Sequence, residues 1–167
     1  MSELSEARAR IAESGVIDLH VDSFIWTRVC GYDVTRSHRT RRPPYFGGHV
    51  DLPRLRDAGV TGAFWSITTQ PFRGRRSRDA RWRRNASRLL GSLGPDAGVR
   101  WVTRAADYAA ARKSGQLALM LAIQGASCLE GTALDAQLPP ELLRVTLTHM
   151  TASRLGSANT PFGGRGG

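Results

Sequence analysis

Continuous apolar runs alternate with helix-spaced polar segments along most of the chain. A run that is apolar throughout, rather than at every second position, is typical of a parallel strand covered on both faces. Five such runs occur, at Val16–His20, Gly59–Ile67, Val99–Thr103, Leu117–Ile123 and Leu143–Thr148. Because helical patterns separate most of them, the order of elements predicts an α/β fold built from parallel βα units.

The helical segments have recognisable ends. The first is predicted at Glu3–Ser14, with Ser2 as its N-cap and Gly15 ending it. Further helices are expected at Leu52–Ala58, Ser77–Gly91, Ala105–Ser114 and, as a short stretch, Pro140–Leu143. Residues 30–48 show no clear period and are rich in Arg, Pro and Gly, which predicts a long loop after the first strand. In a barrel, such a loop lies beside the active site.

Composition indicates a soluble globular protein. The 167 residues are 41% hydrophobic, enough for a single domain over residues 1–167 with its own core. No run approaches the roughly 18 consecutive apolar residues of a membrane span, and the N-terminus is polar, so we expect a cytoplasmic protein that does not enter a membrane. Cys30 and Cys128 lack metal-type spacing and are expected to be buried or half-buried thiols without a disulfide.

The net charge of +10 comes almost entirely from arginine, since Lys113 is the only lysine. Half of the basic residues fall in Arg36–Arg42 and Arg73–Arg88, and such clusters can neutralise phosphates. The alternative is a compositional bias with solvated arginines. In the second cluster apolar residues recur at helical spacing, and no helix-turn-helix, zinc-finger or aromatic RNA-binding pattern is present. We therefore expect solvent-facing arginines and no specific nucleic-acid partner.

Polar residues with catalytic chemistry stand at the C-terminal ends of three apolar runs. His20 and Asp22 end the first, Gln124 follows the fourth and His149 follows the fifth. In parallel βα folds these ends gather the catalytic groups on one face. Each residue also has an ordinary role open to it, as a hydrogen-bonded strand end, an N-cap or a polar loop residue. The His-x-Asp pair, with both side chains on one face of a strand, suits a divalent ion such as zinc.

Four stretches resemble landmarks of the membrane dipeptidase family, also called the renal dipeptidase family. They are IDLHVDS, HVDLPRLRDAGVTGAFWSI, LALMLAIQGA and LLRVTLTHM, in that order, from about Val16 to His149. The resemblance implies a TIM-type (β/α)8 barrel metallopeptidase that holds two zinc ions and hydrolyses dipeptides. It also implies that His20 and Asp22 bind metal, that the residue at position 124 bridges the two ions, and that His149 contacts substrate.

The bridging position departs from the family pattern. The family has a glutamate before Gly-Gly, whereas this chain has Gln124 before Gly125 and Ala126. An amide offers one neutral carbonyl oxygen and an NH2 group that repels metal. We therefore expect at most one weakly held zinc ion. Glu130, six residues later, is expected to be a solvated charge in a loop rather than a substitute ligand.

Length is the second departure. The family's two remaining histidine ligands come from later strands, and only five of eight strands are counted before Gly167. The sequence predicts the N-terminal portion of a dipeptidase-like barrel, truncated after about five strands. Its open sheet edges and half-covered apolar strands would favour self-association.

Three functional hypotheses follow. In the first, a dipeptidase, a metal-activated water attacks the peptide carbonyl, with His149 near the developing oxyanion, and the activity of this chain is impaired. The second is a catalytically inactive barrel fragment with a binding or self-association role. The third is a basic nucleic-acid-binding module. Zinc content with dipeptide turnover, an inert oligomer, or salt-sensitive retention on nucleic acid would distinguish them.

Overall fold

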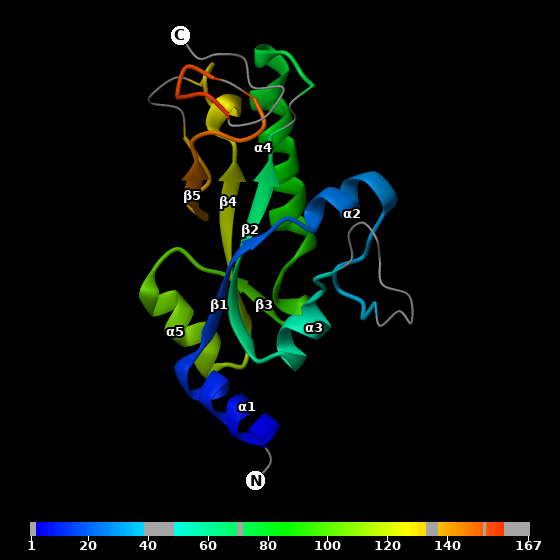
Figure 1. Ribbon diagram of the computed structural model, residues 1–167, viewed down its shortest axis with the longest axis vertical. Helices are drawn as coiled ribbons and strands as arrows, with labels where there is room; N and C mark the ends of the chain where they lie inside the picture. Colours follow the sequence, from blue (N-terminus) through cyan, green and yellow to red (C-terminus); the bar gives the residue numbers. More distant parts are fainter. Residues whose placement is uncertain (1–2, 39–48, 70–71, 133–136, 152, 159–167) are drawn as a thin grey trace. The chain divides into compact units, whose positions relative to one another are not determined.

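The computed structural model describes residues 3–38, 49–69, 72–132, 137–151 and 153–158, with helices and strands in alternation (Figure 1). The side chains of residues 75 and 76 are also outside the description. The helices are α1 (Glu3–Ser14), α2 (Phe24–Cys30), α3 (Leu52–Asp57), α4 (Arg75–Ser92) and α5 (Ala105–Lys113), with 3-10 turns η1 (Pro95–Ala97) and η2 (Ala126–Cys128). The strands are β1 (Val16–Val21), β2 (Val60–Thr68), β3 (Val99–Trp101), β4 (Leu117–Gln124) and β5 (Leu142–Thr146).

The strands form one five-stranded sheet in the order β1-β2-β4-β3, with β5 also paired to β4. β1 is parallel to β2, and both β3 and β5 are parallel to β4. β3 pairs with the first half of β4, where Val99 lies opposite Leu117, and β5 pairs with the second half, where Gln124 lies opposite Thr146. The five predicted strands and their parallel direction are confirmed, with ends that differ by one or two residues.

The described residues fall into two compact units, the first Met1–Trp65 with Leu93–Met120 and the second Ser66–Ser92 with Leu121–Gly167. In the first unit, a cluster of Val102, Ala111, Ala118 and Met120 packs with Phe64 and Tyr108. It joins α5 to β2 and β4. Burial on both faces explains why residues 117–123 of β4 are apolar without interruption.

Helix α4 supplies the core of the second unit. Trp82, Ala86 and Leu89 are at most 1% exposed, whereas Arg84 and Arg88 face solvent. The predicted amphipathic helix is therefore confirmed. Asp79 fixes one side of it, because its Oδ1 accepts hydrogen bonds from the indole of Trp82, the guanidinium of Arg83 and the hydroxyl of Thr132 at 3.1, 3.0 and 2.9 Å.

Some sequence expectations fail. Helix α2 was not predicted, and the helix expected at Pro140–Leu143 does not form, because Leu142 begins β5 and pairs with β4. Cys30 is exposed rather than buried, since it ends α2 at the surface, while Cys128 is buried as expected; both are free thiols. Ser2 and residues 39–48 of the predicted loop lie outside the described residues. Among the described helices, none is long and apolar enough to cross a membrane.

Candidate functional site

His20 and Asp22 lie at the C-terminal end of β1. Val21, between them, is 2% exposed and pairs with Trp65 of β2, whereas His20 and Asp22 are exposed. Leu19, on the other side of His20, is also exposed, and Asp22 follows the last residue of β1, so burial does not decide whether the imidazole and the carboxylate share one face.

Asp18 is a residue that the sequence analysis missed. Its Oδ1 accepts a hydrogen bond from the backbone N–H of His20 at 2.8 Å. The register of β1 on β2 shifts between Asp18 and Val21, so the regular ladder is interrupted where His20 stands. Asp18 therefore satisfies a backbone donor at the irregularity and fixes the local conformation of His20. The available signal was the alternation Asp-x-His-x-Asp.

Gln124 is the last residue of β4 and is half-buried. Its side-chain carbonyl Oε1 accepts a hydrogen bond from the hydroxyl of Thr68, at the end of β2, over 2.9 Å. Its backbone carbonyl accepts from the N–H of Thr69 at 3.0 Å. The amide oxygen is thus already engaged by a donor, and the NH2 group of the same amide can only donate. Gln124 is held firmly in place, but as a neutral hydrogen-bonding residue.

His149 lies three residues after β5, and the chain after β4 approaches it closely. A Cβ atom placed on Gly125 would stand 3.3 Å from the Cβ of His149, and Gly125 has a φ of +99°. Only glycine adopts this conformation readily, so the backbone directly after Gln124 can pass His149 at close range. The structure therefore brings Gln124 and His149, both in the second unit, to neighbouring positions.

The two other candidate ligands near Gln124 are engaged elsewhere. Burial raises the pKa of the Cys128 thiol to about 11, so at neutral pH it is not a thiolate, and its Sγ donates to the carbonyl of Gly125 at 3.5 Å. Glu130 is half-buried rather than a solvated loop charge, because its Oε1 accepts from the backbone N–H of Arg154 at 2.6 Å. It ties the loop after η2 to the segment after β5.

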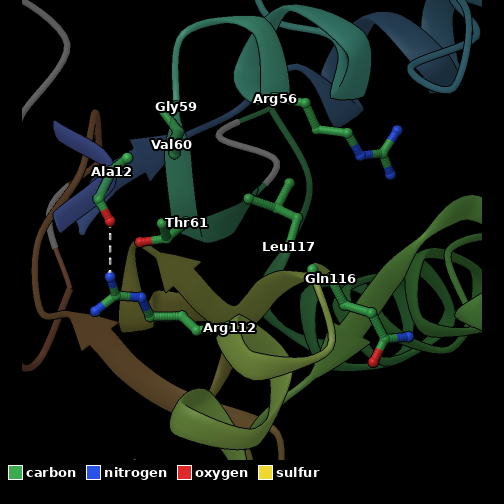
Figure 2. A pocket seen from close by; sticks show the side chains of 9 residues that line it. Ala12, Arg56, Gly59, Val60, Thr61, Arg112, Gln116 and Leu117 are labelled. Atoms are coloured by element: carbon green, nitrogen blue, oxygen red, sulfur yellow. Dashed lines mark hydrogen bonds between the residues drawn. The ribbon is translucent and has the colours of Figure 1, made fainter. Parts of the chain in front are cut away.

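A cavity of about 360 Å³ lies in the first unit, where β2 and β4 begin, at the strand ends opposite to His20 (Figure 2). Arg112 donates from Nη2 to the carbonyls of Ala12 and Glu13 at 3.1 and 3.2 Å, which satisfies the last turn of α1. The Thr61 hydroxyl lies 2.7 Å from the Tyr108 hydroxyl. Arg112 thus attaches α1 at this cavity, and the contact between Thr61 and Tyr108 joins β2 to α5.

The donor chemistry fits a metal ion at one position and not at another. His20 and Asp22 offer an imidazole and a carboxylate, the ligands that zinc accepts. Gln124 does not fit a bridge between two ions, because its amide is neutral and offers one carbonyl oxygen, while its NH2 group can only donate. Within the part of the chain that the structure describes, no group of three or more His, Cys, Asp or Glu side chains is arranged to hold a metal.

Two solved structures are similar to this chain. A metallopeptidase from Rhodobacter sphaeroides, liganded with a phosphinate mimic of the dipeptide L-Ala-D-Ala, is similar with a TM-score of 0.51 and 18% identity; the match covers 68% of this chain and 39% of that chain. The dipeptidase AC, a metallopeptidase of family M19, gives a TM-score of 0.49 and 22% identity, covering 68% of this chain and 36% of that one. The chain therefore spans less than two fifths of the length of either relative.

Sequence comparison gives the family. No curated protein matches the chain. The family model described as membrane dipeptidase, peptidase family M19, matches residues 4–163. The predicted α/β fold with parallel strands of a TIM-type barrel is confirmed by the sheet and by the similarity to the Rhodobacter sphaeroides metallopeptidase. Because the family model covers nearly the whole chain, the chain belongs to the membrane dipeptidase family, peptidase family M19.

Proposed function

We propose that this protein is a metal-dependent dipeptidase, with zinc as its metal and dipeptides as its substrates. The observation that carries the proposal is the exposed pair His20 and Asp22 at the end of a parallel strand, in a chain of a metallopeptidase family. A relative of the same fold is liganded with a dipeptide mimic, which supports a dipeptide as substrate here. The grouping of His20 and Asp22 with His149 into one active site rests on the family resemblance.

The residues have separate roles in this proposal. His20 and Asp22 would hold the cation, which supplies Lewis acidity for peptide-bond hydrolysis when bound. Asp18 holds the backbone of His20 through its 2.8 Å hydrogen bond and so limits the positions that the imidazole can take. His149 would contact the substrate and can donate a hydrogen bond to oxygen as negative charge develops on the peptide carbonyl.

Zinc binding and hydrolysis test the proposal together. We expect weak zinc binding, measured by competition with a chelator, and slow zinc-dependent hydrolysis of a small dipeptide panel. His20→Ala and Asp22→Asn should each weaken zinc binding at least about tenfold, since the first removes a ligand and the second replaces a carboxylate with a neutral amide. His49→Ala, an exposed histidine elsewhere in the same unit, is the matched control and should change neither quantity. Unchanged zinc binding in both ligand variants, or no hydrolysis with zinc present, would overturn the proposal.

Self-association is the second part of the proposal. Apolar side chains are exposed along two strands: Val16, Ile17 and Leu19 on β1, and Leu143 on β5 with Leu147 directly after it. Exposed apolar strands tend to pair with other chains. We expect light scattering after gel filtration to show oligomers that shift toward the monomer in Leu19→Ser. A monomer in the unchanged protein at high micromolar concentration would contradict this part alone.

A further inference from the structure

One face of the second unit carries polar side chains in two successive layers. The upper layer contains Thr68 and Gln124, joined by the 2.9 Å hydrogen bond. Two residues earlier on the same strands stand Ser66 on β2 and Ala122 on β4, and residues two apart on a strand share a face. Arg144 of β5 pairs in register with Ala122, so it belongs to the lower layer.

The side chain of Arg144 connects β5 to β2 within this lower layer. Its Nη2 donates to the hydroxyl of Ser66 at 3.2 Å. Because β4 pairs with β2 and with β5, the arginine side chain crosses over β4 to reach Ser66. Ala122 makes this possible, because its methyl group is fully buried and leaves room for the arginine stem to pass. A guanidinium stays protonated at any physiological pH, so the lower layer carries a fixed positive charge.

This charge lies close to position 124. The guanidinium is hydrogen-bonded to Ser66, and Gln124 is hydrogen-bonded to Thr68, two residues further along β2, which corresponds to a rise of roughly 6.6 Å between the two layers. Arg144 is half-buried, and half-buried charges are screened by salt much less than exposed ones. A divalent cation at position 124 is therefore opposed by the arginine as well as poorly bound by the amide.

We propose that Arg144 is a specificity-determining residue: with Gln124, it makes this face unfavourable for a divalent cation, so that the protein does not hold a bridged metal pair. The inference rests on the proposed function. It also means that Gln124→Glu alone is insufficient to create strong metal binding at position 124. The new carboxylate would face the positive charge of Arg144, which offsets the negative charge needed to attract the cation.

The test compares zinc affinity and stoichiometry, by chelator competition and elemental analysis, in four proteins: unchanged, Gln124→Glu, Arg144→Met and the double variant. We expect the double variant to bind zinc at least about tenfold more tightly than Gln124→Glu alone. Gln124→Glu with Arg84→Met, which removes an exposed arginine from α4, is the matched control and should resemble Gln124→Glu. Arg144→Lys in the Gln124→Glu background keeps the charge and should leave zinc binding weak.

Three outcomes would overturn the inference about Arg144. Equal zinc affinity in Gln124→Glu and the double variant, with zinc still lost in His20→Ala, would overturn the inference and leave the proposed function standing. In the Gln124→Glu background, zinc binding that is as tight with Arg144→Lys as with Arg144→Met would also overturn the inference. The shape of the arginine, rather than its charge, would then be responsible for the weak binding. Zinc binding absent from every protein would overturn the proposed function and the inference with it. Thermal unfolding of each variant verifies that the fold is retained.

Discussion

Loss of the Asp51 carboxylate is predicted to destabilise the first unit. Its side chain is fully buried and caps α3, where Oδ1 accepts from the backbone N–H of Arg54 at 2.8 Å. Oδ2 accepts from the backbone N–H of His38 at 2.9 Å and lies 3.2 Å from Nε of Arg54. The carboxylate therefore joins the segment after α2 to the start of α3 through one side chain.

The size of the effect follows from these contacts. Asp51→Ala removes an N-cap, which costs about 1 kcal/mol, and takes the acceptor from the half-buried backbone N–H of His38, which costs about 1–3 kcal/mol, while Arg54 keeps the carbonyls of His38 and His49 as acceptors. We expect a total loss of about 2–4 kcal/mol, the sum of these two contributions. Asp51→Asn retains one oxygen for the cap and should lose less. Asp96→Asn, an exposed acid at η1, is the control and should change stability by less than about 0.5 kcal/mol.

Urea unfolding followed by tryptophan fluorescence measures these differences as shifts in the midpoint. With a slope of about 1–3 kcal/mol per molar urea, Asp51→Ala should lower the midpoint by at least about 0.7 M. A second readout is the pKa of Tyr32, which is raised by burial and further by the charge of Asp51. Asp51→Asn should therefore lower the Tyr32 pKa in an absorbance titration. A loss below about 1 kcal/mol in Asp51→Ala would refute the assignment of Asp51 as the buried connector.

Further predictions concern reactivity and local stability. At pH 8 a thiol reagent should modify the exposed Cys30 and spare Cys128, whose pKa of about 11 reflects burial, whereas both should react in urea; modification of both in the native protein would contradict this. Arg112→Met should speed amide hydrogen exchange in α1, and unchanged exchange would show that α1 is held otherwise. Gly59→Ala should destabilise by about 1–3 kcal/mol in thermal melts, because its φ is +75° and a Cβ would stand 2.8 Å from the Ile11 side chain; an equal melting temperature would disprove it.

The strands were predictable because their apolar runs reflect burial, whereas the errors come from short segments. Helix α2 has the sequence FIWTRVC, whose β-branched and aromatic residues favour strand and obscure the helical period. Its end is marked by Gly31, which takes a left-handed φ of 69°. The segment at Pro140–Leu143 could not be resolved from local pattern, because Leu142 joins β5 through pairing with β4, a contact between residues distant in sequence.

The same limit applies to the candidate site. Chain position alone placed His20, Asp22 and Gln124 at strand ends, since those ends follow from where the apolar runs stop. It did not give the partners of these residues. The hydrogen bond between Thr68 and Gln124 joins two strands separated by two helices in the chain, and it depends on strand register. A sequence pattern predicts which residues end a strand but not which side chains they meet across the sheet.

The surroundings of Gln124 show which neighbour distinguishes an amide from a carboxylate at this position. The Thr68 hydroxyl donates its hydrogen bond to Gln124, and it would donate equally well to a glutamate, so it fits either residue. The effect of Arg144 differs between glutamine and glutamate, because its positive charge adds to the charge of the residue at position 124. With Gln124 the two side chains carry a net charge of +1, and with glutamate they would carry none. A glutamate beside an uncharged residue at position 144 would give these two side chains a net negative charge. Gln124 and Arg144 therefore each disfavour a cation on this face, the first as a neutral ligand and the second as a positive charge, so changing only one of them leaves the other effect in place.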